Sequence, residues 1–209
     1  MSAIRQILVF SLVCIALADS CGRRAHATDI SPVDVIEAGV AIMAQAKAKY
    51  GSRSEGDEQE LVNAVRLFLA EYTDVQYAAR LILSRHWETA TSEQRDRFVA
   101  AFDNLVTTRV AILVPDIEFD SVRIEPFLGD TEDIPLMIQA TFRNTDNQIT
   151  HFVLVTHKRK GNWLIFDVIA EGVSYVKTYR NQVNGEIADI GLEAMLKRFE
   201  LRSTELGNG

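Results

Sequence analysis

The chain has 209 residues, of which 47% are hydrophobic and 24% are charged. This length is typical of one domain, and this composition is typical of a globular protein rather than a disordered one. The formal net charge of −7 argues against a general nucleic-acid binder and against tight electrostatic docking on an anionic bilayer. A local basic patch remains compatible with this charge.

The first residues are typical of a cleaved secretory signal peptide. Arg5 provides a positive start, and residues 7–18 form an apolar run that is too short to span a bilayer comfortably. The motif Ala25-His26-Ala27 matches an A-x-A cleavage site. We therefore predict a signal peptide over residues 1–27 and one mature domain over residues 28–209.

Both cysteines, Cys14 and Cys21, lie in the segment that cleavage would remove. The mature chain would then have no cysteine and would need no disulfide. Two alternatives stay open for this segment. One is acylation at Cys21, for which Asp19 makes a poor lipoprotein signal, and the other is an uncleaved membrane anchor.

Helices are predicted through the first half of the mature chain. One begins at Ser31-Pro32, because serine is a favoured N-cap and proline suits the first helical position. A second begins near Asp57, and Asp74 caps a third. The longest helix follows a capping box at Thr91–Gln94 and ends before Pro115.

After Pro115 the apolar residues recur every second position, which indicates β-strands. Residues 121–126 and 136–143 alternate apolar and polar side chains on either side of a hairpin loop at Gly129–Asp133. Residues 152–156 and 163–169 form two more apolar strands that flank a polar, glycine-bearing turn. Short connections predict an antiparallel meander of four strands.

A last helix begins near Tyr175, where Ser174 is the N-cap. Gly185 and Gly191 weaken this helix and can bend or split it. Helices before and after an antiparallel sheet give an α+β fold. To bury its helices the sheet has to curve, and a curved sheet with helices on its concave side forms a cone, as in NTF2-like folds.

Several motifs carry a resemblance to a known family. They are Gly161-x-Trp163-x-x-x-Asp167-Val168, Glu171-Gly172-Val173-Ser174, Tyr179-Arg180-x-Gln182, Asp74-Val75-x-Tyr77-Ala78-Ala79, Trp87-x-x-Ala90-Thr91 and Gln94-Arg95-x-x-Phe98. In this order and context they resemble the toluene-tolerance/MlaC family, whose members are periplasmic phospholipid-binding shuttles of Gram-negative bacteria. The resemblance extends over most of the mature chain and implies a helix-rich cone with an apolar cavity.

The resemblance also implies a function. It implies a periplasmic carrier that receives phospholipid from an outer-membrane lipoprotein–porin complex and exchanges it with an inner-membrane ABC transporter and its substrate-binding ring. Outer-membrane lipid asymmetry and solvent tolerance would depend on such a carrier, which has no enzymatic activity and no cofactor other than its lipid cargo. Departures at Thr73, Ser84, Val110 and Val183 leave room for a paralogue with another lipid, such as the hopanoid-associated branch.

Physical chemistry supports a lipid in such a cavity. An empty apolar cavity costs about 24 cal/mol per Å³, whereas each buried methylene of a lipid tail contributes about 0.8 kcal/mol. The residues that we expect to line the cavity are Leu136, Ile138, Phe142, Val153, Val155, Leu164, Phe166, Val168, Val173, Tyr175, Val176 and Tyr179. Packed core is the alternative for each strand residue, and periodicity leaves open which face of a strand points inward.

Polar residues in these motifs have two interpretations each. Asp167 would accept backbone or arginine hydrogen bonds at a strand end, or would act with a Tyr or His in an NTF2-like isomerase-type enzyme. Arg180 would be structural or solvated, or would face a lipid phosphate. His151 and His157 lie about 20 Å apart on one strand, which is too far for one metal ion. A plain adaptor with a filled core is the third hypothesis.

Overall fold

The computed structural model of the chain describes residues 31–52, 54–125 and 135–205. The predicted signal peptide and the predicted hairpin loop at Gly129–Asp133 lie outside these residues. The α+β class is confirmed, because helices pack on an antiparallel sheet. The elements are α1 (Pro32–Tyr50), α2 (Glu55–Tyr72), α3 (Val75–Leu83), α4 (Arg85–Thr89), α5 (Ser92–Leu113), a 3₁₀ turn (Val114–Asp116), β1 (Ile117–Ile124), β2 (Leu136–Asn144), β3 (Ile149–Arg159), β4 (Asn162–Ala170), β5 (Val173–Ser174), α6 (Tyr175–Ile190) and α7 (Leu192–Glu205).

These elements include two that the sequence did not predict, and the last helix is split, as its glycines allow. The short helix α4 and the short strand β5 were not predicted, and β5 makes the sheet five-stranded with the order β1-β2-β3-β4-β5. The last helix is split at Gly191, whose φ of 82° is left-handed and therefore ends α6. Gly185 remains inside α6.

Helix caps form where the sequence predicts them. The hydroxyl of Ser31 accepts a hydrogen bond from the backbone N–H of Asp34, and the Asp34 carboxylate accepts one from the N–H of Ser31. Thr91 and Gln94 form the same reciprocal pair at the start of α5. Each capping box satisfies two N–H groups that would otherwise have no partner inside the helix, so these short local patterns fix where α1 and α5 begin.

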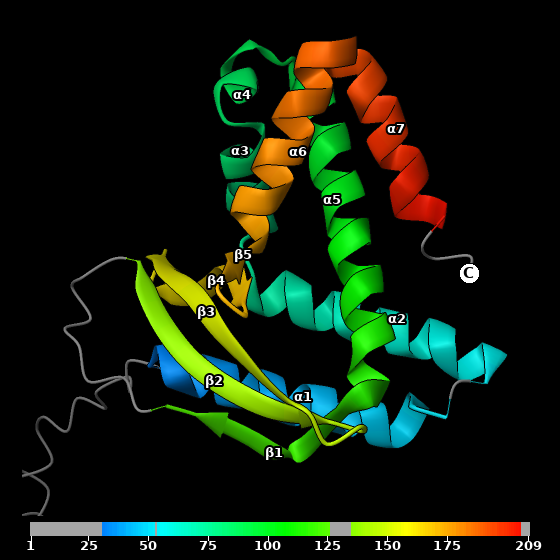
Figure 1. Ribbon diagram of the computed structural model, residues 1–209, viewed down its shortest axis with the longest axis vertical. Helices are drawn as coiled ribbons and strands as arrows, with labels where there is room; N and C mark the ends of the chain where they lie inside the picture. The colour runs from blue at the N-terminus through cyan, green and yellow to red at the C-terminus, as the bar shows by residue number, and fades with distance from the viewer. Residues whose placement is uncertain (1–30, 53, 126–134, 206–209) are drawn as a thin grey trace, which may run out of the picture.

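The protein has two halves that share one helix (Figure 1). In the first half, α1 and α2 lie beside the sheet. In the second half, α3, α4, α6 and α7 gather around the N-terminal part of α5. One apolar core joins α3, α5, α6 and α7, and separate clusters join α1 with α2, α5 and the sheet. Val106 on α5 packs against both cores, so α5 is the common support of the two halves.

Helix α5 also passes a simple test for a membrane span. Residues 92–116 are long and apolar enough to cross a bilayer by length and composition. In the structure, however, Phe98, Phe102 and Leu105 are almost completely buried by other helices. A buried helix of a globular core has the same composition as a membrane span, and α5 is such a helix here.

One face of the sheet packs on helix α1. On β2, the buried residues Leu136, Ile138 and Ala140 alternate with the exposed residues Met137 and Gln139. Leu136 and Ile138 contact Val35 and Ile36 of α1, together with Trp163 and Ile165 of β4. We call the face that carries Leu136, Ile138 and Ala140 the inner face, and the opposite face the outer face.

A β-bulge in β4 changes which side chains reach the inner face. Val155 lies opposite Asp167, but the next residue of β3, Thr156, lies opposite Ile165. Phe166 is therefore an extra residue, and the alternation of side chains shifts by one position across it. Ile165 and Val168 consequently share the inner face, although one has an odd number and the other an even number.

Helix α7 is held to α5 by an arginine. The guanidinium of Arg97 donates to both carboxylate oxygens of Glu200 at 2.7 and 2.9 Å, and to Glu193 at 2.9 Å. These hydrogen bonds lower the pKa of both carboxyl groups below the ordinary value of 4.5. A carboxylate with a lowered folded-state pKa stabilises the protein above its unfolded pKa, and the stabilisation disappears as the pH falls through the folded pKa.

We therefore expect Arg97→Met to lower the melting temperature at pH 7 and to have much less effect at pH 3. As the pH falls below the ordinary pKa of 4.5, protonation of Glu193 and Glu200 progressively removes the ion pairs in the wild-type protein. Thermal unfolding at the two pH values measures the change in melting temperature. The control for loss of charge is Arg198→Met, which replaces an exposed arginine of α7. An Arg97→Met deficit of equal size at both pH values would contradict this account.

Ser84 lies in a backbone conformation that suits glycine. Between α3 and α4 it has φ 53° and ψ −124°, which residues with a Cβ rarely adopt. We expect Ser84→Gly to stabilise the protein by about 1 kcal/mol, which corresponds to about 2–4 °C in melting temperature. Ser84→Ala keeps the strain and should give no such gain. Thermal unfolding of the two variants tests this, and an equal gain for both would disprove the explanation.

Candidate functional site

The candidate lipid-contacting surface lies on the inner face of β2, β3 and β4. Across these strands Ile138 lies opposite Leu154, which lies opposite Val168. Exposure differs within this row, because Ile138 is 1% exposed whereas Leu154 and Val168 are only partly buried. Helix α1 therefore buries Ile138, together with Trp163 and Ile165 of β4, but leaves Leu154 and Val168 incompletely covered.

Aromatic side chains extend this surface. Phe152 lies in the next row of the inner face, opposite Ala140 and Ala170, whose small side chains leave it room. The ring of Phe142 packs on the ring of Phe152 with the centroids 5.6 Å apart. Both rings are partly buried. Phe142, Phe152, Leu154 and Val168 thus form a continuous, incompletely covered apolar surface, which we call the inner apolar surface.

Two predicted lining residues are core residues instead. Leu136 is 2% exposed and Ile138 is 1% exposed, and both pack against α1. The sequence left pocket lining and packed core open for each of them, and the structure places them in the core. The reason is that α1, which is distant from them in sequence, lies directly on this end of β2.

Other predicted residues lie on the outer face. Residues paired directly across two strands share a face of the sheet. On this face, which points away from α1, the predicted lining residues are Val153 (paired with Gln139), Val155 (paired with Met137) and Leu164 (paired with His157). Phe166, the bulge residue, packs edge-on against Tyr77 of α3 with the centroids 5.1 Å apart, and it also contacts the ring of His157. The structure therefore does not bring all the predicted strand residues to one surface.

The predicted residues near Gly172 separate into an exposed pair and a pair that packs among helices. Val173 is 58% exposed and Tyr175 is 43% exposed, so both present apolar atoms to the solvent. Val176 is 7% exposed and belongs to the helical core. Tyr179 packs edge-on against Phe102 with the centroids 5.8 Å apart. Val173 and Tyr175 therefore stay candidates for the mouth of the predicted pocket, whereas Val176 and Tyr179 pack among helices.

Asp167 has a structural role. Its carboxylate accepts hydrogen bonds from the hydroxyl of Ser174 at 2.6 Å and from the backbone N–H of Val176 at 3.0 Å. Ser174 in turn caps α6 by accepting from the N–H of Lys177. The prediction that Asp167 accepts hydrogen bonds at a strand end is confirmed. A base with both oxygens engaged at a helix start is poorly placed to take a proton from a ligand.

Arg180 also has a structural contact. Its Nε donates to the backbone carbonyl of Leu81 at 2.7 Å, and the side chain of Asn184 donates to the carbonyl of Ile82 at 2.9 Å. Both carbonyls belong to the last turn of α3, where the helix itself offers no donor. The structural interpretation of Arg180 is the one that these contacts support.

The sequence missed a buried polar cluster around Asp74. The Asp74 side chain is 3% exposed and caps α3 by accepting from the N–H of Tyr77. It also accepts from Arg159 at 2.9 Å through each oxygen, and His157 lies 3.1 Å away. The backbone N–H of Asp74 donates to the carbonyl of Ile165. We call Asp74, His157 and Arg159 the Asp74 cluster, and it fastens the start of α3 to β3 and β4.

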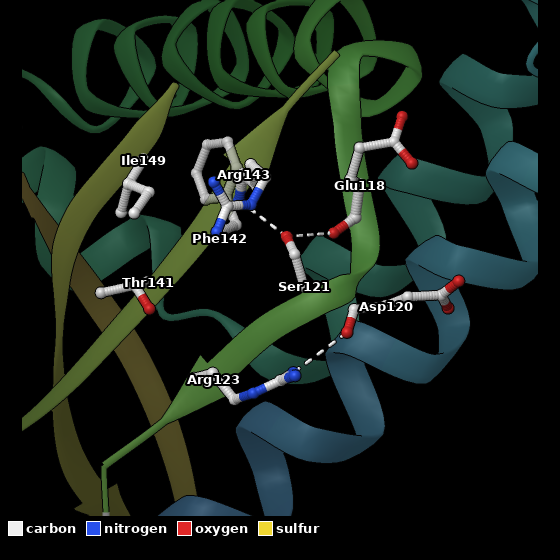
Figure 2. A pocket seen from close by; sticks show the side chains of 8 residues that line it. All are labelled: Glu118, Asp120, Ser121, Arg123, Thr141, Phe142, Arg143 and Ile149. Carbon is white, nitrogen blue, oxygen red and sulfur yellow. Dashed lines mark hydrogen bonds between the residues drawn. The ribbon is translucent and has the colours of Figure 1, made fainter. Parts of the chain in front are cut away.

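One pocket lies at the edge of the sheet, next to the inner apolar surface (Figure 2). It has a volume of about 410 Å³ and is lined by Glu118, Asp120, Ser121, Arg123, Thr141, Phe142, Arg143 and Ile149. Six of these eight residues are polar or charged, so this pocket differs from the apolar cavity that the sequence predicts. That cavity stays a prediction, which the partly covered inner apolar surface supports.

Within the described ranges, no group of three or more His, Cys, Asp or Glu side chains could hold a metal ion. His151 and His157 lie on the same face of β3 and do not meet. His157 instead stacks on the ring of Tyr77 with the centroids 4.6 Å apart. The environment of His157 is thus aromatic on one side and acidic on the other.

Comparisons with known proteins agree with this fold. A solved phospholipid-binding protein from Ralstonia solanacearum, in complex with a phospholipid, superposes with a TM-score of 0.72 at 18% identity, covering 82% of this chain and 96% of that one. The intermembrane phospholipid transport system binding protein MlaC of Haemophilus influenzae is 26% identical over 164 residues, which are 74% of this chain and 73% of the relative. The family model for MlaC protein matches residues 33–200. The chain therefore belongs to the MlaC family.

Proposed function

We propose that this protein is a lipid carrier that binds the acyl chains of a phospholipid on the inner apolar surface and transports the lipid through the periplasm. The observation that carries this proposal is the combination of family membership with the row Ile138, Leu154, Val168, in which Leu154 and Val168 are only partly covered by the helices. The similarity to a Ralstonia protein in complex with a phospholipid and to a Haemophilus transport protein supports it.

The physical argument concerns hydrocarbon in water. Two sixteen-carbon tails would cost roughly 25 kcal/mol to expose, at about 0.8 kcal/mol per methylene. A carrier that covers the tails with apolar side chains makes transfer between two membranes nearly neutral in free energy. Phe142, Phe152, Leu154 and Val168 offer such side chains, and Phe152 faces two alanines that leave space beside it.

The cellular context is part of the proposal. We propose a cleaved signal peptide over residues 1–27, a periplasmic mature chain, an outer-membrane lipoprotein–porin complex as one partner, and an inner-membrane ABC transporter with its substrate-binding ring as the other. Outer-membrane lipid asymmetry is the process served, and a hopanoid or another lipid is the alternative cargo. The acidic net charge of −7 fits a freely diffusing carrier better than one that adheres to anionic lipid.

Native mass spectrometry of protein purified from the periplasm without detergent tests the function. We expect a population of the protein that is heavier by the mass of one lipid, and fragmentation identifies that lipid. Because an apolar surface of this kind binds tails rather than a specific headgroup, several species with different chains should appear. Protein that is free of lipid under these conditions, and that takes up no fluorescent phospholipid from vesicles, would favour an adaptor.

A further inference from the structure

We infer that the pocket at the edge of β1 and β2 is a binding site for a phosphate ester, separate from the surface proposed for hydrocarbon. We call it the bulge pocket. Its floor is the irregular pairing of β1 with β2, where the register shifts between Glu118 and Arg123. Such a bulge opens the ladder and leaves backbone and side-chain donors without strand partners.

Ser121 holds this bulge in shape. Its hydroxyl accepts a hydrogen bond from the backbone N–H of Arg143 at 2.7 Å and donates to the carbonyl of Glu118 at 2.6 Å. The hydroxyl thus replaces the direct bond that a regular ladder would make between the two strands. This arrangement fixes the backbone of β1 and β2 on both sides of the pocket, so the pocket exists before any ligand arrives.

Two arginines border the pocket and are oriented in advance. Arg123 donates through one nitrogen, Nη1, to the carbonyls of Asp120 and Val122 at 3.0 and 2.8 Å. Arg143 donates through Nη1 to the side-chain oxygen of Asn147 at 3.1 Å. Each guanidinium has five N–H donors, so donors remain available on both for another acceptor. Arginines held in this way bind phosphate oxygens with little further loss of entropy.

The charge of the pocket favours an anion. The lining carries the carboxylates of Glu118 and Asp120 and the guanidiniums of Arg123 and Arg143, and Lys47 pairs with Glu118 at 3.3 Å, so the cations exceed the anions by one. Figure 2 shows the side chains of Glu118 and Asp120 on the opposite side of β1 from Thr141, Phe142 and Ile149. Arg143 lies on the side that faces β2, whereas the guanidinium of Arg123 lies on the other side of β1, next to Asp120. The side that faces β2 is therefore positive, although the whole chain has a net charge of −7.

Hydroxyl and apolar groups complete the site. Within the described part of the chain, the hydroxyl of Thr141 has no hydrogen-bond partner and is free to donate to a ligand. Ile149 is 53% exposed, and Phe142 lines both this pocket and the inner apolar surface. A volume of about 410 Å³ is at the lower end for small-molecule sites. The pocket thus suits a phosphate with a short apolar substituent.

Two sources share this chemistry, a lipid headgroup and a water-soluble phosphate. Titration of the isotopically labelled mature protein with inorganic phosphate, glycerophosphoethanolamine and dihexanoylphosphatidylethanolamine distinguishes them by NMR. We expect the amide signals of Ser121, Thr141 and Arg143 to shift with the ligand. Shifts with the two esters and not with inorganic phosphate identify a headgroup. Shifts with inorganic phosphate that the lipid does not reproduce identify a soluble phosphate. Both outcomes support the site.

Variants test the role of each group. Arg143→Met should weaken binding about tenfold, because one charge-assisted hydrogen-bonding partner is lost, and Arg198→Met on α7 removes the same charge far from the pocket and should leave binding within about twofold. Thr141→Val removes a hydroxyl without touching the arginines, so it tests the site if Arg143→Met unfolds. No shift with any of the three ligands at millimolar concentration, or an equal loss in Arg198→Met, would overturn the inference. Because glycerophosphoethanolamine has no tails, this result is independent of hydrocarbon binding.

Discussion

Replacing Asp74 by alanine is expected to lower the melting temperature by about 6–12 °C, which corresponds to about 3 kcal/mol in a domain of this size. The change removes the cap of α3, worth about 1 kcal/mol, and the charge-assisted bonds from Arg159 and His157. The loss of this cap leaves the backbone N–H of Tyr77 without its acceptor. Thermal and urea unfolding monitored by circular dichroism measure the effect.

Two further variants separate the contributions within the Asp74 cluster. Asp74→Asn keeps an oxygen that can cap α3 and loses the negative charge, so it should cost roughly half as much. Asp189→Ala removes an exposed carboxylate from α6 and should change the stability by less than about 0.5 kcal/mol. If Asp74→Ala were no more destabilising than Asp189→Ala, the cluster would not fasten α3 to the sheet.

Replacing Val168 by aspartate is expected to reduce the lipid that co-purifies with the protein by about 100-fold. A charge placed against hydrocarbon costs about 2.5–3.5 kcal/mol, and Val168 is the residue that β4 contributes to the inner apolar surface. Because this side chain is only partly buried, the variant should still fold. The amount of lipid per protein, quantified by mass spectrometry after extraction, is the measurement.

The neighbouring residue provides a matched control. Ile169 lies next to Val168 on β4 and is also partly buried, but it pairs with Val153 and Ser174 and points to the outer face. Ile169→Asp places the same charge in the same strand and should keep most of the lipid. Equal retention of lipid in the two variants would argue that hydrocarbon does not contact the inner face. Equal loss of lipid in the two variants would show that the effect of the charge is not specific to the inner face.

Local signals in the sequence predicted the helix starts and the class of fold. Ser31, Thr91 and Ser174 form the predicted caps because a cap depends on residues only three positions away. The antiparallel meander followed from short connections between alternating segments, and that order is found. Family motifs added the expectation of a lipid, which periodicity could not have provided.

Non-local contacts explain what the sequence could not predict. Arg159 meets Asp74 although the two are separated by 85 positions, and neither residue is unusual in its own segment. The bulge at Phe166 shifts the alternation of β4, so parity alone assigns Val168 and Ile165 to opposite faces when they share one. Leu136 and Ile138 became core residues because α1 lies on them, which only the tertiary packing determines.

The sharing of α5 by both apolar cores has a consequence for how this molecule comes apart. Val106 contacts clusters on either side, and the helix continues unbroken from Ser92 to Leu113. Unfolding of one half would therefore remove packing contacts from α5, which the other half also needs for its own core. Denaturation should proceed as one concerted event, and a protease that nicks the chain should release no fragment that stays folded alone.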